Sequence, residues 1–509
     1  MTGSDDTALT LADRVHAILS LDPDAPAIEF EGRWHSWREL SQVVDRLDEL
    51  LTRAALGRNT PVGMLLRNTP SMVGAMLGAV VTERCIVTLN PHQGDAKVAH
   101  DVLDVRTPVV VAAAEDWDRD QLRAAVRGIE GVGIVLTGDP TDPARFVAGL
   151  EQVGPGPHRK PSPGVAIEML TSGTTGPPKR IQLETAVFER TITAARRHYG
   201  KKGDDDAGAR LGKGVAIVSS PFVHMSGLFR TLLNVCEGRK LALLPRFAVG
   251  PWVDLVRRHR PRAVSLVPTA LRMVLDAEID PADLSSIDVV TSGTAKLDPE
   301  VQLAFERRFG IPVLPSYGAT EFAGGAAGWT LALHREWSDL KRGSVGRPQP
   351  GREVRIVDPS SGDPLPVDEI GLIEIRSGAE AAWSRTTDLG RVDPDGFLWI
   401  VGRSDDAILR GGFKIMPDDV TRVLASHSAV REACVVGLPD ARLGQIPVAA
   451  VELHAGAEID GDALLTFARE HLTSYQVPVE IRIVPALPRT PSLKVSRPEV
   501  RALFQGKPR

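Results

Sequence analysis

Cysteine is scarce in this chain of 509 residues, which has only Cys85, Cys236 and Cys434. Their wide spacing fits neither a zinc site nor a C-x-x-C motif, and three residues cannot build a disulfide framework. No apolar run approaches the ~20 residues of a membrane-spanning helix. The acidic start, MTGSDDTALT, is unlike a signal peptide. These absences predict a cytoplasmic enzyme without an integral membrane segment.

An excess of positive charge is also missing. The chain has 60 lysines and arginines against 65 acidic residues, a net charge of −5, and no basic stripe. We therefore expect no nucleic-acid partner. Hydrophobic residues make up 43% and charged residues 25%, which excludes a disordered or fibrous chain. Single cores stop growing near ~250–300 residues, so more than one domain is expected. The sequence does not indicate an oligomeric state.

Short apolar runs alternate with helical patterns through the first two-thirds of the chain. Strands are predicted at Val62–Leu66, Cys85–Leu89 and Val289–Thr291, and helices at Ser71–Val81 and Asp298–Phe309. Near-continuous apolar strands between helices predict an α/β fold with mostly parallel, helix-covered sheets. After residue 346 short strands and turns predict a small β-rich subdomain, followed by a smaller α+β unit.

The segment with the clearest chemical signal is Met169–Lys179, MLTSGTTGPPK. Its glycines allow backbone N–H groups to approach an anion, its hydroxyls donate hydrogen bonds, and its lysine adds a positive charge. Such a loop suits a polyphosphate, although its spacing is not that of a Walker A loop. The residues expected to hold phosphate are Thr171, Ser172, Gly173, Thr174, Thr175, Gly176 and Lys179.

This string resembles the phosphate-loop signature of the adenylate-forming superfamily, which includes acyl-CoA synthetases, adenylation domains of peptide synthetases, and luciferases. Four further motifs follow in the family's order. They are Ser316–Glu321 (SYGATE), Asp388–Gly390 with its following D-G and G-R pairs, Leu409–Pro417 (LRGGFKIMP) and Pro488–Arg497 (PRTPSLKVSR). The matches span most of the chain, and the acyl-CoA synthetase branch is the most similar.

The resemblance implies a nucleotide site for ATP and Mg²⁺. Tyr317 would stack on adenine, Thr320 would contact the α-phosphate and Glu321 would hold Mg²⁺. Asp388 would bind the ribose hydroxyls, with Arg403 in support. Lys494 would bridge the carboxylate and the α-phosphate during adenylation. The adenine pocket would be completed by Gly293, Thr294, Ala295, Ser316, Gly318 and Ala319.

The resemblance also implies an acyl pocket and a coenzyme A site. His224 would lie at the acyl pocket or gate it, and no aspartate follows the pocket strand, which disfavours an α-amino acid substrate. The other acyl-pocket residues would be Phe222, Val223, Met225, Gly318, Phe322, Ala323, Gly324 and Gly325. Coenzyme A would meet the glycine turn formed by Arg410, Gly411, Gly412 and Phe413.

The family arrangement further implies a large N-terminal domain over 1–403, a hinge at 404–406 and a small mobile C-terminal domain over 407–509. Asp405 would lie at the centre of the hinge. In the family, rotation about this hinge withdraws the lysine motif and presents the glycine turn to the second substrate.

Several positions depart from the family pattern. Leu493 replaces the glycine that precedes the terminal lysine, Thr387 replaces the glycine before Asp388, and Thr294 and Lys296 differ from the usual S-G-G-A-P. The stretch between Ile375 and Asp388 is also shorter than usual. All of these lie near ATP sites or the domain junction.

The main hypothesis is therefore an acid–CoA ligase that uses ATP, Mg²⁺ and coenzyme A on an apolar or bulky carboxylic acid. The departures leave open a ligase that only thioesterifies a preformed acyl-adenylate. A stand-alone adenylating enzyme that loads a carrier protein, and a non-catalytic nucleotide-binding relative, are the other hypotheses.

Overall fold

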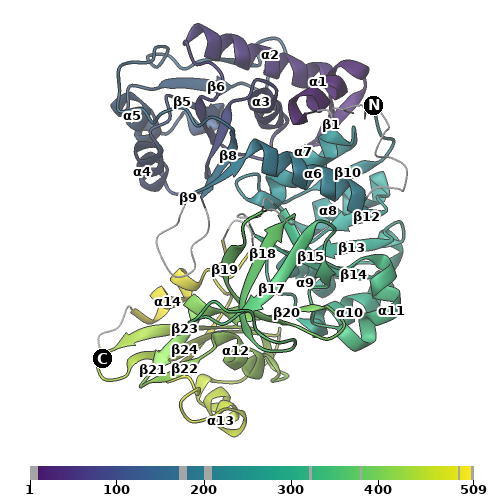
Figure 1. Cartoon of the computed structure of the whole chain (residues 1–509), viewed down its shortest axis with the longest axis vertical. Coiled ribbons are helices and arrows are strands. Elements are labelled where there is room, and N and C mark those ends of the chain that lie inside the picture. Colours follow the sequence, from purple (N-terminus) through teal and green to yellow (C-terminus); the bar gives the residue numbers. More distant parts are fainter. Residues whose placement is uncertain are drawn as a thin grey trace, which may run out of the picture. The chain divides into compact units, whose positions relative to one another are not determined.

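The computed structural model describes residues 10–170, 180–199, 209–319, 322, 324–378, 381–490 and 493–505. Within these ranges the chain forms two compact units (Figure 1). The first holds the described residues up to 326 together with 349–351, and the second holds 327–348 and 352–505. The predicted boundary at 404–406 lies inside the second unit, and the hinge stays a prediction.

The first unit contains a seven-stranded sheet in the order β7-β6-β5-β3-β4-β8-β9. The five strands from β6 to β8 in that order are parallel, and the two outer strands are antiparallel to their neighbours. The strands are β3 (Pro61–Leu65), β4 (Cys85–Leu89), β5 (Val109–Ala113), β6 (Val132–Leu136), β7 (Ala144–Phe146), β8 (Val165–Leu170) and β9 (Arg180–Glu184).

Two further sheets complete this unit. One has the order β10-β11-β1-β2, in which only β1 and β2 are antiparallel, and the other contains β12, β13, β14 and β15. Their strands are β1 (Pro26–Phe30), β2 (Arg33–Ser36), β10 (Val215–Val218), β11 (Lys240–Leu243), β12 (Ala263–Ser265), β13 (Val289–Ser292), β14 (Val313–Ala319) and β15 (Gly324–Gly328).

Helices connect these strands, as the predicted α/β alternation requires. They are α1 (Leu11–Leu21), α2 (Trp37–Arg53), α3 (Pro70–Val81), α4 (Asp95–Val105), α5 (Asp120–Gly128), α6 (Thr185–Tyr199), α7 (Met225–Cys236), α8 (Val249–His259), α9 (Pro268–Asp276) and α10 (Pro299–Phe309). No helix in the described ranges is both long and apolar enough to cross a membrane.

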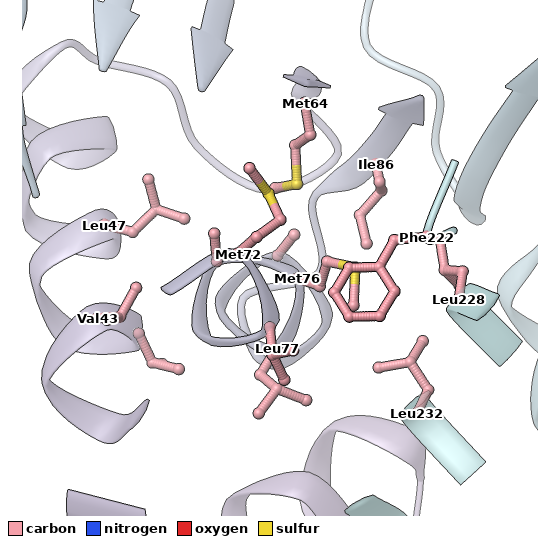
Figure 2. Packing of buried hydrophobic residues seen from close by; sticks show 14 of the residues in the cluster. Val43, Leu47, Met64, Met72, Met76, Leu77, Ile86, Phe222, Leu228 and Leu232 are labelled. Atoms are coloured by element: carbon pink, nitrogen blue, oxygen red, sulfur yellow. The ribbon is translucent and has the colours of Figure 1, made fainter. Parts of the chain in front are cut away.

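Helix α3 is the centre of the largest core cluster. It begins with Pro70 after the cap Thr69, whose hydroxyl accepts from the Met72 N–H at 3.4 Å. Helix α2 packs so closely that a Cβ at Gly74 would lie 2.7 Å from the Cβ of Val43. Met76 lies beside Phe222, Leu228 and α7 (Figure 2). The same cluster contains residues of β3, β4 and α7, so α7 packs onto the first sheet through this core.

The second unit contains two antiparallel sheets and their helices. The first sheet has the order β17-β18-β19-β20, and the second has the order β22-β21-β24-β23 with β25 parallel to β24. The elements are α11 (Leu331–Lys341), β16 (Arg347–Pro348), β17 (Arg352–Val357), β18 (Gly371–Ser377), β19 (Ser384–Val392), β20 (Leu398–Arg403), β21 (Ile408–Arg410), β22 (Phe413–Ile415), α12 (Pro417–Ala425), β23 (Val430–Asp440), β24 (Gly444–Leu453), α13 (Gly461–His471), β25 (Ile481–Val484) and α14 (Arg497–Gln505).

All three cysteines are buried. Burial raises the pKa of the Cys85 thiol to about 12, with the Glu168 charge adding to the effect. Burial also raises the pKa of the Cys434 thiol to about 12. Thiols with such pKa values are almost entirely protonated at neutral pH, and therefore react slowly.

Candidate active site

The predicted adenine-pocket residues meet at the carboxyl ends of two parallel strands. Thr291 of β13 pairs with Leu314 of β14, and Ser292 pairs with Pro315. Gly293 follows directly, and a Cβ there would lie 2.7 Å from the Ser316 hydroxyl oxygen. This edge also carries Thr294, Ala295, Tyr317, Gly318 and Ala319. Open α/β sheets bind ligands at such an edge, and the roles of these residues remain predictions.

Thr294 has the backbone conformation that glycine adopts most easily. Its φ is 71°, in the left-handed region that is unfavourable for a β-branched residue. The residue therefore preserves the backbone turn after β13 although the glycine of the family pattern is absent. Backbone strain of this kind is concentrated at functional sites.

The predicted acyl-pocket residues are distributed between the core and the strand ends. The Phe222 side chain is fully buried in the core beside Met76 and Leu228 (Figure 2), and its place in the acyl pocket stays a prediction. Val223 is also buried, and His224 is the N-cap residue of α7, which begins at Met225.

Close backbone packing surrounds the glycines of this predicted pocket. A Cβ at Gly318 would lie 2.3 Å from the Gly324 carbonyl oxygen, so no side chain fits there. A Cβ at Gly324 would lie 2.9 Å from a Thr191 methyl group, and one at Gly325 would lie 2.7 Å from the Gln349 amide nitrogen. Phe322 is buried.

Asn68, which the sequence analysis did not select, holds the segment that precedes α7. Its amide group donates to the carbonyl oxygens of Ser220 (3.0 Å) and Leu244 (3.1 Å), and its Oδ1 accepts from the Phe222 N–H (3.0 Å). Asn68 is only 4% exposed. A lone asparagine between a strand and a helix usually indicates a turn, so no signal in the sequence distinguished it.

Replacing Asn68 with alanine is expected to lower the free energy of unfolding by about 2–3 kcal/mol, because it leaves buried backbone groups without partners. Urea unfolding measures the change. Asn90→Ala is the matched control, since Asn90 accepts one exposed hydrogen bond from the His92 N–H at 2.9 Å. If Asn68→Ala lowers the free energy of unfolding no more than Asn90→Ala does, Asn68 does not hold the segment before α7 in place.

Asp388 and Arg403 face each other across β19 and β20. An Arg403 Nη1 lies 3.9 Å from the Asp388 carboxylate, and Arg403 also donates to both Asp405 oxygens, at 2.9 and 3.0 Å. The hydrogen bonds from Arg403 to Asp405 raise the pKa of Arg403, so it remains cationic. Thr387, which departs from the family's glycine, accepts from Arg403 at 2.5 Å.

Lys494 lies within electrostatic range of the same pair, although it is about 90 residues further along the chain. Burial lowers the pKa of its ammonium group, the Arg403 cation lowers it further, and Asp388 raises it. The second unit therefore brings Lys494, from the last motif, within electrostatic range of Asp388 and Arg403, which belong to an earlier motif. Their chemistry, one carboxylate and two cations, suits a nucleotide with its charged phosphates.

The turn before Lys494 is closed by backbone hydrogen bonds. Thr490 N–H donates to the Lys494 carbonyl and Leu493 N–H donates to the Thr490 carbonyl, both at 2.8 Å. Leu493 has a φ of 64°. The leucine therefore adopts the left-handed conformation that a glycine would adopt, at a cost of about 1–2 kcal/mol.

Replacing Leu493 with glycine is expected to raise the free energy of unfolding by about 0.5–1 kcal/mol, because relief of strain exceeds the entropy lost by glycine. Leu409→Gly is the control, since Leu409 is 58% exposed in the extended strand β21 and should lose stability instead. Denaturant unfolding compares the two. A loss of stability in both variants would contradict the strain argument.

The predicted coenzyme A residues form a tight hairpin between β21 and β22. Arg410 pairs with Phe413, and the two intervening glycines have φ values of 56° and 88°. Positive φ at both central residues is typical of a type I′ turn. Arg410 donates to the carbonyl oxygens of Tyr475 (2.8 Å) and Val477 (3.1 Å). The Phe413 ring stacks on Tyr475 with a centroid separation of 4.6 Å and is 56% exposed.

The predicted hinge residue Asp405 lies in a short 3₁₀ turn, Ser404–Asp406. Asp406 contacts Arg497, which also donates to Asp418 at 3.1 Å. Burial raises the pKa of Asp406, an effect that the Arg497 cation opposes. Arg497, at the start of α14, therefore links this turn to Asp418 of α12 through two ion pairs.

Part of the predicted site lies outside the described residues. These positions are Thr171, Ser172, Gly173, Thr174, Thr175, Gly176, Lys179, Thr320, Glu321 and Ala323. They include the whole phosphate string and the expected Mg²⁺ ligand. Among the residues that the structure describes, no group of three acidic, histidine or cysteine side chains could hold a metal ion.

Comparisons with known proteins agree on the family. The model described as "AMP-binding enzyme" matches residues 17–381, and the model "AMP-binding enzyme C-terminal domain" matches 419–494. The 4-coumarate–CoA ligase 3 of Oryza sativa subsp. japonica is 28% identical over 92% of this chain and 87% of its own length. The indoleacetate–CoA ligase of Aromatoleum aromaticum is 28% identical, with coverage of 98% and 99%.

A solved structure has the same fold. ATP-bound MatB from Rhodopseudomonas palustris superposes with a TM-score of 0.81 at 23% identity, covering 98% of this chain and 99% of that one. The first family model alone spans more than half of the sequence. The α/β sheets, the helices that connect them and the ordered motifs are thus those of one group of enzymes. This chain belongs to the adenylate-forming AMP-binding enzymes.

Proposed function

We propose that this chain is an acid–CoA ligase that forms an acyl-adenylate from ATP and a carboxylic acid, then transfers the acyl group to coenzyme A. AMP and pyrophosphate are the other products. The similar curated proteins named above are CoA ligases. The observation that supports the proposal is that the Asp388 and Arg403 charges, which lie 3.9 Å apart, both act on Lys494.

In the adenylation step these residues bind and orient the nucleotide. Asp388 accepts hydrogen bonds from the ribose hydroxyls, and Arg403 holds the Asp388 side chain in place. Lys494 donates to the carboxylate and the α-phosphate, where negative charge increases as the new bond forms. Mg²⁺ would neutralise the phosphates when bound, and Glu321 is its expected ligand.

The second step uses the glycine turn. Gly411 and Gly412 leave the backbone bare, which allows a slender thiol-bearing arm to pass closely. Phe413 and Tyr475 offer an exposed aromatic pair next to it. Rotation about Ser404–Asp406 would exchange the lysine turn for the glycine turn.

The acid is proposed to be apolar or bulky rather than an α-amino acid. The segment before His224 carries no acidic side chain to pair with an ammonium group, and the strand after Phe322 begins with the small residues Gly324 and Gly325. Gly324→Trp should abolish turnover of a bulky acid. Because a Cβ at Gly324 would lie 2.9 Å from a Thr191 methyl group, cooperative urea unfolding must first show that the variant folds. Unchanged turnover would place the pocket elsewhere.

Calorimetric titration with Mg-ATP tests the nucleotide site without knowledge of the acid. We expect one-to-one binding in the intact chain and at least about tenfold weaker binding in Asp388→Ala, because a charged hydrogen-bond acceptor is lost. Asp339→Ala is the matched control, since the Asp339 side chain is 94% exposed.

The absence of ATP binding in a folded protein would contradict the full two-step reaction. It would favour the ligase that acts only on preformed acyl-adenylates, which synthetic adenylates with coenzyme A would then test. The left-handed φ of Leu493 argues against this alternative, because a leucine in the conformation that glycine favours is compatible with the turn that we propose for Lys494. Substituting a phosphopantetheinyl carrier protein for coenzyme A separates the ligase from a carrier-loading enzyme, and release of AMP with a CoA thioester excludes a non-catalytic relative.

A further inference from the structure

A polar cavity lies within the first unit, and its lining contains none of the residues assigned above. Its volume is about 770 Å³, and it is lined by the end of α4, by residues 157–159 and by the strands β8 and β9. Figure 1 shows where α4, β8 and β9 lie in the fold. The side chains that determine its character are Arg106, His158, Arg159, Glu168, Arg180 and Gln182. None of them was assigned to ATP, the acyl group or coenzyme A.

The one deeply buried carboxylate of this cavity lining is already neutralised. Glu168 is 2% exposed, and Arg159 donates to both of its oxygens, at 2.6 and 2.7 Å. Gln182 donates a further hydrogen bond to Glu168 at 3.1 Å. Such a bidentate pair satisfies both charges, so Glu168 has little capacity left to balance another cation.

Arg180 is the cation that this arrangement leaves incompletely paired. Its side chain is 15% exposed, and its Nε lies 3.9 Å from Glu168. That Nε is buried and makes no hydrogen bond within the described parts of the chain. Its Nη1 donates to the Thr88 carbonyl at 3.3 Å. Burial lowers the pKa of Arg180, although the Glu168, Asp101 and Asp104 charges oppose this effect.

One further cation and one imidazole nitrogen belong to the cavity lining. Arg106 is exposed and uses its Nε on the Leu103 carbonyl at 3.3 Å. The His158 Nε2 is buried and has no hydrogen-bond partner among the described residues. Three guanidinium groups against the two lining carboxylates, Asp104 and Glu168, give the cavity an excess of one positive charge.

We propose that this cavity is a second anion site, which binds a phosphate group through Arg106 and Arg180. Guanidinium groups donate parallel N–H bonds to phosphoryl oxygens, and an anion would supply the partner that the buried Arg180 lacks. Inorganic phosphate and pyrophosphate share this chemistry. The lining contains none of the residues predicted to contact ATP, so we expect both anions to bind when ATP is present.

The test is calorimetric titration of the full chain with inorganic phosphate and, separately, with pyrophosphate, at constant ionic strength and with or without millimolar ATP. We expect binding that persists with ATP and that weakens about tenfold or more in Arg180→Gln and in Arg106→Gln. The anion that binds more tightly under these conditions is the occupant. Arg262→Gln, whose side chain is 84% exposed, should bind as the unaltered chain does.

Three results would overturn the proposal: no binding of either anion at millimolar concentration, binding that ATP abolishes, or binding unchanged in both cavity variants. If Arg180→Gln does not fold, Arg106→Gln decides, because Arg106 is exposed. The measured quantity is binding rather than turnover, so failure of this proposal is distinguishable from failure of the proposed ligase activity.

Discussion

Replacing Lys494 with methionine is expected to slow acyl-adenylate formation about 10³-fold without lowering the unfolding temperature. The large kinetic effect follows because a preorganised donor at the reacting phosphate typically contributes 10²–10³-fold or more. Stability should not fall, because burial and Arg403 lower the pKa of Lys494 and thus disfavour its charged form in the folded state. Pyrophosphate exchange measures the rate, and thermal unfolding measures the stability.

The change of stability with pH is a second quantity that the Lys494→Met variant should alter. The pKa of Lys494 is lower in the folded chain than the 10.5 of the unfolded chain, so the folded state binds fewer protons between these two values. Stability therefore rises with pH across that interval in the native chain, and this contribution disappears in Lys494→Met. Unfolding temperatures recorded from neutral pH to about pH 10.5 would reveal it.

Lys213→Met is the matched control, because Lys213 is an exposed lysine on a loop. It should leave exchange and stability unchanged. Transfer from a synthetic acyl-adenylate to coenzyme A should survive in Lys494→Met, since the lysine serves the first step. Exchange at the native rate in Lys494→Met would contradict its catalytic role.

Replacing Gly412 with valine is expected to slow acyl transfer to coenzyme A about 100-fold while adenylate formation continues. The φ of Gly412 is 88°, so valine costs about 1–2 kcal/mol in backbone strain. A Cβ there meets nothing within 4 Å, so the hairpin has room for the side chain. The added bulk projects where the thiol arm is proposed to pass, and small misplacements of a reactant cost about 10²-fold.

Gly456→Val is the matched control for this prediction. Gly456 has a φ of 77° and also has open space around its Cβ direction, so it carries the same strain without touching the glycine turn. Both variants should lose similar stability, and only Gly412→Val should lose acyl transfer. Rapid mixing of preformed adenylate with coenzyme A measures the rate. Equal rates in the two variants would exclude the glycine turn from the second step.

Much of the fold could be predicted from the sequence because parallel strands buried on both faces are continuous apolar runs. Cys85–Leu89 was predicted with the bounds that the structure has, and Ser71–Val81 differs from α3 by one residue. Cys85–Leu89 is rich in β-branched residues, which suit a buried strand. The segment of α3 is apolar and contains Gly74 and Gly78, whose small size lets α2 pack closely against it.

Other features could not be predicted because they depend on residues that are distant in the chain or on strained backbone. Asn68 positions Phe222 from 154 residues away. Leu493 adopts a left-handed conformation that its own side chain disfavours, so its identity gave no indication of this conformation. The pairing of Arg159 with Glu168, which leaves Arg180 incompletely balanced, likewise appears only when β8 and β9 are assembled.

The buried cysteines have a practical consequence for measuring this enzyme. With pKa values of about 12 for Cys85 and Cys434, only about one in 10⁴ of these groups is a thiolate at pH 8. A thiolate must attack a chromogenic disulfide reagent to release its colour, and Cys236 is buried as well. The folded protein would therefore contribute almost no colour over the minutes of an assay. The consumption of coenzyme A can then be measured by titrating its free thiol with such a reagent. The native chain can be used, without replacing its cysteines.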